Sequence, residues 1–170
     1  MPVDEESIMA LARAAVPVFA GWCVIDVVES DGSTRRLAPA HSDPLRTRLA
    51  DKLQLYPADP KAAHPRSEAL RVGTPYVHPQ VADASIAALA QSREHLQAMR
   101  SLAPRSSLGM PIIARDRVLG VMTFVWTDPS HCYDDADVPL ARALADQVGI
   151  VLGNVQLFPA GRARFASELK

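Results

Sequence analysis

Residues 107–126 read Ser107-Leu-Gly-Met-Pro-Ile-Ile-Ala114, then Arg115-Asp116-Arg117, then Val118-Leu-Gly-Val-Met-Thr-Phe-Val-Trp126. The two longer pieces are apolar and the short piece between them is polar, which predicts two antiparallel strands joined by a hairpin turn. A helical pattern follows from Asp134 to Phe158, and Pro159-Ala-Gly161 is expected to stop it. The second half of the chain is therefore predicted to be a hairpin that leads into a long helix.

This final helix carries two apolar stripes. The main face contains Val138, Ala141, Leu144, Ala145, Val148, Val151, Leu152, Val155 and Phe158. A second stripe lies about 200° away and steps by three and four residues through Leu140, Ala143, Gln147, Ile150, Asn154 and Leu157. A helix with two apolar faces needs two partners, one of which is its own sheet. Either the same chain covers the second stripe, or a second copy does so in a homodimer whose register is fixed by Gln147 and Asn154.

The remaining pattern predicts an α+β fold. Apolar spacing predicts a helix from Asp4 to about Pro17, and Trp22 to Glu29 has the composition of a buried strand. Residues 35–42 form a second strand, placed at the sheet edge by Pro39. Helical segments at 45–55, 65–72, 83–90 and 92–102 surround a short strand at 75–78. Sequential hairpins favour an antiparallel sheet of five or six strands, with the terminal helices on one face and residues 43–102 over the other.

Length and charge narrow the function. The chain has 170 residues, enough for one ordinary domain, and a net charge of -1 that favours neither nucleic acid nor a membrane surface. The N-terminus lacks the features of a signal peptide and no apolar run is long enough to span a bilayer, so a cytoplasmic protein is expected. Its two cysteines, Cys23 and Cys132, are expected to be free thiols.

Several segments in this order resemble the GAF domain family. They are the first helix, the strand pair over 22–42, Ala69-Leu-Arg-Val-Gly-Thr-Pro75, Arg105-Ser-Ser-Leu-Gly-Met-Pro-Ile112, Val118-Leu-Gly-Val-Met-Thr-Phe124 and the helical stretch 133–157. The resemblance covers residues 4–158 and leaves 159–170 as a tail or linker. It implies a sensory or regulatory module of signalling proteins that binds a small molecule or chromophore between sheet and helices. It also implies dimerisation through terminal helices and control of an attached or separate output partner.

The candidate ligand-binding residues are Trp22, Asp26, Tyr76, His78, His95, Met110 and Phe124. The candidate dimer interface contains Leu140, Gln147, Ile150, Asn154 and Leu157. Asp26 interrupts an apolar strand, so its carboxylate is either satisfied by an arginine or backbone amide, or anchors a ligand. His64 and His131 fall in loops and are expected to be solvated. No histidine lies in a metal-ligand pattern, and the sequence identifies no cofactor.

Catalysis is not expected. The chain has neither a Gly-x-Ser-x-Gly elbow nor a glycine-rich phosphate loop. One GAF-like enzyme class, the free methionine sulfoxide reductases, uses attacking and resolving thiols, but its cysteine motifs are not recognisable here. The bilin-binding GAF domains require a cavity cysteine, whose position Cys132 does not match. The alternatives to a ligand-binding regulatory module are therefore such a thiol enzyme or a dimerisation scaffold that binds nothing.

Overall fold

A computed structural model describes residues 3–16, 18–37, 40–41, 43 and 47–168. Its antiparallel sheet has the strand order β2-β1-β6-β5-β4, with β3 also paired to β1. The strands are β1 (Trp22–Val28), β2 (Thr34–Arg36), β3 (Ala40–His41), β4 (Tyr76–His78), β5 (Ser106–Ala114) and β6 (Arg117–Trp126). The expected antiparallel α+β sheet is thus confirmed.

The β5–β6 hairpin turns as predicted. Ala114 pairs with Arg117, and the two residues between them, Arg115 and Asp116, have φ angles of 54° and 62°. Two successive positive φ angles define the tight turn whose twist matches that of paired strands. This hairpin brings β6 between β5 and β1, so that it forms the centre of the sheet.

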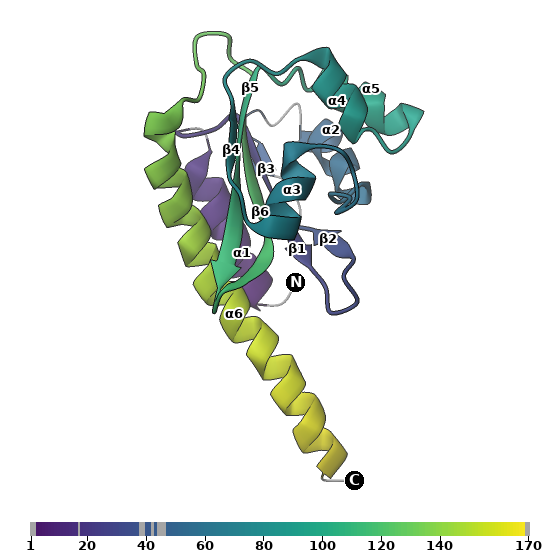
Figure 1. Cartoon of the computed structure of the whole chain (residues 1–170), viewed down its shortest axis with the longest axis vertical. Coiled ribbons are helices and arrows are strands. Elements are labelled where there is room, and N and C mark those ends of the chain that lie inside the picture. The colour runs from purple at the N-terminus through teal and green to yellow at the C-terminus, as the bar shows by residue number, and fades with distance from the viewer. Residues whose placement is uncertain (1–2, 17, 38–39, 42, 44–46, 169–170) are drawn as a thin grey trace.

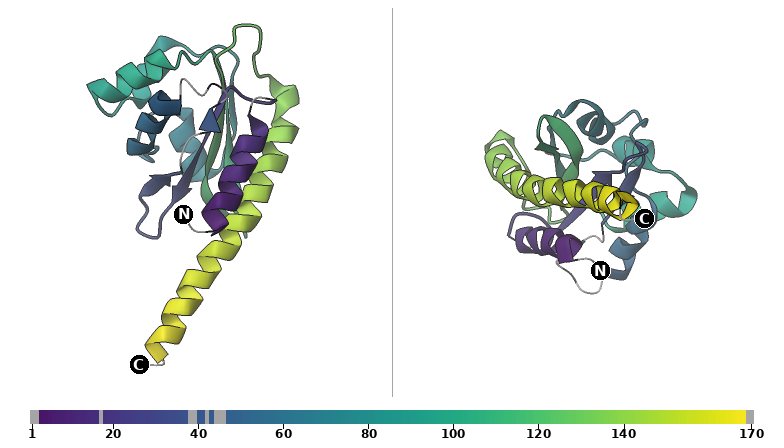
Figure 2. Two further views of the ribbon diagram at one scale, coloured as in Figure 1. Left: turned by 180° about the vertical axis from the view of Figure 1, so that it is seen from behind. Right: turned by 90° about the horizontal axis from the view of Figure 1, so that it is seen from below.

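Helices cover both faces of the sheet (Figures 1 and 2). Helices α1 (Val3–Ala15) and α6 (Val138–Glu168) lie side by side on one face. The other face carries α2 (Thr47–Lys52), the 3-10 turn η2 (Leu53–Leu55), α3 (Pro65–Val72), α4 (Asp83–Leu89) and α5 (Arg93–Ser101). A 3-10 turn, η3 (Asp135–Asp137), precedes α6. This is the predicted arrangement, with the terminal helices together and the middle of the chain opposite.

Strand alternation separates the α1/α6 core from the apolar clusters on the opposite face of the sheet. Cys23, Ile25 and Val27 of β1 face α1 and α6, whereas Trp22 and Val24 face α4 and α5. The α1/α6 core also contains, among others, Ile8, Leu108, Met110, Ile112, Met122, Phe124, Tyr133, Ala141, Ala145 and Val148. The described part of the predicted main face of the last helix is therefore packed on its own sheet.

Two sequence predictions are wrong, and a third falls partly on residues that the structure does not describe. The predicted strand 35–42 is two short strands, because β2 pairs with Asp26 to Val28 whereas β3 pairs with Trp22 and Cys23. Pro39 and the predicted start of the next helix, residues 44–46, lie outside the described residues. The last helix does not end at Pro159 but continues to Glu168, since an interior proline disfavours a helix without always ending it.

The C-terminal part of α6 extends beyond the sheet (Figure 1). Despite its length, α6 lacks the sustained apolarity that a membrane span requires, and so does every other helix among the described residues.

Candidate functional site

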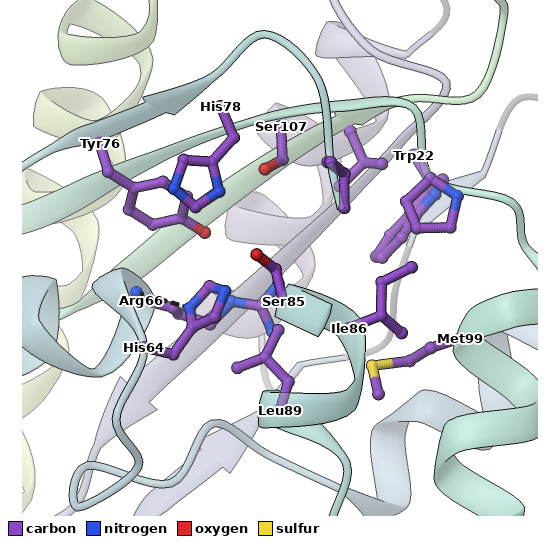
Figure 3. Close-up of a pocket in the computed structure, with 13 residues that line it drawn as sticks. Trp22, His64, Arg66, Tyr76, His78, Ser85, Ile86, Leu89, Met99 and Ser107 are labelled. Carbon is purple, nitrogen blue, oxygen red and sulfur yellow. Dashed lines mark hydrogen bonds between the residues drawn. The ribbon is translucent and has the colours of Figure 1, made fainter. Parts of the chain in front are cut away.

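A pocket lies on the sheet face opposite α1 and α6 (Figure 3). Its volume is about 40 Å³. It is lined by Trp22, His64, Arg66, Tyr76, His78, Val81, Ser85, Ile86, Leu89, Met99, Pro104, Ser107 and Val125. The pocket is therefore a preformed but small space between the sheet and helices α3, α4 and α5.

The sheet supplies one wall through residues on alternate positions. Ser107 of β5 lines the pocket and Gly109 lies on the same face of the strand, whereas Leu108 and Met110 pack in the α1/α6 core. Gly109 pairs with Tyr76, and a Cβ at Gly109 would lie 2.1 Å from the Tyr76 ring. The missing side chain at Gly109 thus leaves room for the Tyr76 ring beside β5.

The pocket has a polar end and an apolar end. At the polar end the ring centroid of His64 lies 5.9 Å from those of Tyr76 and His78, which are 4.9 Å from each other. Figure 3 shows the hydroxyl groups of Tyr76 and Ser85 pointing toward one another across the space. Ile86, Leu89 and Met99 form the apolar end with Trp22. A ligand that fits both ends has a polar head and an apolar body.

Buried donors around this pocket have no partner. Among the described residues, the buried side-chain nitrogen and oxygen atoms without a hydrogen bond are Trp22 Nε1, Arg66 Nε, Tyr76 Oη and Thr123 Oγ1. The first three belong to residues that line the pocket. A buried unsatisfied donor costs about 1–3 kcal/mol, and each of these three has the capacity to donate a hydrogen bond to an acceptor placed beside it.

His64 is part of the structure rather than solvated, which corrects the sequence prediction. It caps the N-terminus of α3, where its Nδ1 accepts a hydrogen bond from the backbone N–H of Arg66 at 3.0 Å. The neutral ring therefore carries its proton on Nε2. Burial, the positive charge of Arg66 and His78 lower the pKa of His64 to about 4. His64 is consequently an uncharged donor at neutral pH.

This pKa predicts an acid-sensitive fold. The folded pKa of about 4 lies below the usual 6.5, so the unfolded chain takes up a proton at His64 more readily than the folded protein does. The protein therefore has its full stability above pH 6.5, where the ring is neutral in both states. That stability is lost as the pH falls toward 4, by about 2 kcal/mol once solvent screening is allowed for. Urea unfolding between pH 7.5 and pH 4 measures it. His64→Asn keeps a helix-capping acceptor, so its stability should fall less with acid.

The exposed variant His131→Asn is the matched control and should keep the wild-type pH dependence. An unchanged pH dependence in His64→Asn would contradict the assignment of this effect to His64.

The seven candidate ligand residues do not all meet in the pocket. Trp22, Tyr76 and His78 line it. Met110 and Phe124 do not, because they point into the core on the opposite face of the sheet. The residues that the sequence reasoning missed are chiefly His64 and Arg66. Pro65 is a typical first residue of a helix, so His64 could have been identified from the sequence as an ordered cap.

Asp26 and His95 are buried but lie outside the pocket lining. Asp26 Oδ1 accepts hydrogen bonds from Arg36 Nε at 2.8 Å and from the backbone N–H of Ala58 at 3.1 Å. The interpretation of Asp26 as a satisfied structural carboxylate is thus confirmed. His95 stacks on Tyr56 and accepts a hydrogen bond from the Gln91 backbone N–H at 3.0 Å, and burial lowers its pKa to about 4.

The thiols lie away from the pocket. Cys23 points into the α1/α6 core, where burial raises the pKa of its thiol, and Cys132 is exposed in the loop before η3. In the part of the chain that the structure describes, no group of three His, Cys, Asp or Glu side chains could hold a metal ion. Burial keeps the Cys23 thiol protonated, which makes it a poor nucleophile, and neither thiol lines the pocket.

The described members of the second stripe on α6 are exposed. Leu140 is 50% exposed and Ile150 is 65% exposed. Ala143, Gln147 and Asn154 are also exposed, and the side chain of Leu157 lies outside the described residues. Among the residues that the structure describes, no other segment covers this part of the stripe. The alternative of a cover within the same chain is therefore wrong for these residues.

The GAF domain family model matches residues 5–152. The chain belongs to the GAF domain family. A domain from Sinorhizobium meliloti 1021, assigned to a two-component sensor histidine kinase, is 19% identical with a TM-score of 0.62, and the match covers 95% of this chain and 99% of that one. The fold of a GAF domain/HD domain protein from Geobacter sulfurreducens is also similar, with a TM-score of 0.70, 17% identity and coverage of 91% and 95%.

Residues 122 to 287 of a methyl-accepting chemotaxis protein give a TM-score of 0.65 at 14% identity, with coverage of 91% of this chain and 92% of that one. No curated protein matches the chain. At these identities the solved structures share the fold of this GAF domain.

Proposed function

We propose that this GAF domain is a sensory and regulatory module that responds to a small molecule bound in the pocket over its sheet. The observation that carries the proposal is the set of unpartnered buried donors on Trp22, Arg66 and Tyr76 around a preformed space. The similar solved domains from a sensor histidine kinase and a chemotaxis protein support a sensory role.

The two alternatives have less support. A thiol enzyme needs a reactive cysteine at its binding site, but Cys23 and Cys132 both lie away from the pocket. A scaffold that binds nothing gains no benefit from buried donors without partners, because each one lowers the stability of the fold. We therefore propose a binding module without catalytic activity.

The sheet connects the pocket with α6. Ser107 of β5 lines the pocket, whereas the next residue, Leu108, packs in the α1/α6 core on the other face. A ligand that shifts β5 would therefore shift the surface on which α6 rests. The exposed second stripe of α6, with Ile150 near its middle, supports the further proposal of a homodimer that passes this change to an output domain or protein.

Native mass spectrometry of freshly purified protein tests this function, since it reports oligomeric state and bound small molecules together. The wild type is expected to be a dimer that retains a small molecule. Ser85→Leu adds a bulky side chain to a pocket of only about 40 Å³ and should abolish retention. Ala84→Leu, at the neighbouring exposed position of α4, is the matched control and should retain it. Retention by Ser85→Leu, or an empty wild-type protein, would contradict the proposal.

A further inference from the structure

The pocket is lined by an arginine, Arg66, that has no counterion among the described residues. Arg66 is only 9% exposed, and its Nε has no hydrogen-bond partner. None of the described residues that line the pocket is Asp or Glu, and no described carboxylate forms an ion pair with Arg66. A mostly buried arginine with an unpartnered Nε and no counterion is unfavourable. A counterion supplied from outside the chain would offset this cost.

The position of Arg66 in α3 makes this charge more unfavourable. Arg66 is the second residue of α3, where the helix dipole is positive and repels a cation. Arg36, which is 4% exposed, forms an ion pair with Asp26 at 2.8 Å. This chain thus neutralises one buried arginine with its own carboxylate and leaves the other facing a pocket without one. A ligand that bears a negative charge would supply the missing counterion.

The neighbouring groups fit the same ligand. Tyr76 offers an unpartnered hydroxyl, and His64, with Nδ1 occupied by the cap of α3, has its Nε2–H as the remaining donor. A carboxylate accepts several such hydrogen bonds and matches the planar guanidinium of arginine. The head of the ligand is therefore expected to be a single carboxylate.

The other end of the pocket sets the size and polarity of the ligand body. Ile86, Leu89 and Met99 offer only apolar contacts. A pocket of about 40 Å³ holds about three water molecules. Three waters fill about as much space as a ligand of about four to six non-hydrogen atoms, because bonded atoms lie closer together than separate molecules. This is far below the roughly 300–1,000 Å³ that drug-sized ligands occupy. A large chromophore or nucleotide does not fit the pocket as it stands.

We propose that the ligand is a short-chain organic monocarboxylate, with its carboxylate at Arg66 and Tyr76 and its hydrocarbon tail against Ile86, Leu89 and Met99. This inference rests on the proposed function, because it names the class of molecule bound at that site.

A probe series tests the class. The sodium salts of acetate, propionate, butyrate and pentanoate are compared with butyramide, butylammonium chloride and sodium sulfate, at constant ionic strength, by thermal unfolding and calorimetric titration. At least one carboxylate should raise Tm by about 5 °C at a hundredfold excess over its Kd. The amide and the ammonium ion should have no effect, because neither places a negative charge beside Arg66.

Arg66→Met removes the charge while keeping a long side chain. It should weaken binding of the best carboxylate by about tenfold to a hundredfold. Without ligand, its Tm should equal or exceed that of the wild type, since an unpaired buried charge is gone. Arg66→Lys keeps the charge and should still prefer butyrate to butyramide. Arg93→Met, at an exposed position of α5, is the matched control and should bind like the wild type.

Four results would overturn the inference. They are equal binding of butyrate and butyramide, unchanged binding of the best carboxylate by Arg66→Met, a sulfate effect that matches the best carboxylate, and no response to any carboxylate in the series. The retention experiment with Ser85→Leu and Ala84→Leu then distinguishes failure of the proposed ligand class from failure of the proposed function. If only Ser85→Leu loses its retained molecule, the pocket binds a ligand of another class and the proposed function stands. If the wild type is empty, both proposals are wrong.

Discussion

Asp26→Ala should lower the free energy of unfolding by about 3–5 kcal/mol, the largest stability effect expected from one substitution in this chain. Asp26 is 0% exposed and Arg36 is 4% exposed, and their side chains form hydrogen bonds of 2.8 and 3.1 Å. Among the described residues, the substitution would leave the buried Arg36 guanidinium with the carbonyl oxygen of Leu53 as its remaining partner, at 3.1 Å. It would also remove the acceptor of the Ala58 backbone N–H.

Urea unfolding monitored by circular dichroism measures this loss. Asp83→Ala removes the carboxylate of an exposed ion pair with Arg100 and is the matched control, with almost no expected change. The double variant Asp26→Ala/Arg36→Met should recover part of the stability, because it removes the unpaired charge as well. A loss below about 1 kcal/mol in Asp26→Ala would show that Arg36 finds another partner or reaches water.

Local pattern was enough to predict most of the fold. The β5–β6 hairpin follows from two apolar runs and a polar turn, and α3 from Pro65 at its start and Gly73 after its end. Gly73 indeed has a φ of 75°, the left-handed conformation that a helix end favours. The division of 35–42 into β2 and β3 could not be predicted, because it depends on where the segment meets β1.

The site was harder to predict than the fold, for a geometric reason. Alternation places Trp22 and Phe124 on definite faces of their strands, but it does not show which face of the sheet receives α6. Met110 and Phe124 were therefore included with the pocket residues although they lie on the other face. Arg66 was missed because its importance comes from burial without a counterion, which no residue spacing reveals.

Ile150→Glu should convert a dimeric protein into a folded monomer. Ile150 is 65% exposed in the single chain, whereas Val148 and Leu152, which hold α6 to the sheet, are 0% and 5% exposed. A glutamate at this position remains in water in the monomer, so the fold should be unaffected. In the proposed dimer the same carboxylate would be buried between helices without a partner, at a cost of several kcal/mol.

Sedimentation velocity at several concentrations, together with circular dichroism, measures both properties. Arg142→Glu introduces the same side chain at an exposed position of α6 outside the second stripe, so it should remain dimeric. A wild-type protein that is already monomeric, or an Ile150→Glu protein that stays dimeric, would exclude the stripe as the interface. A folded monomer beside a dimeric control would instead locate the contact on the helix that packs against β5. Ligand occupancy could then reach the partner subunit through the strand that also lines the pocket.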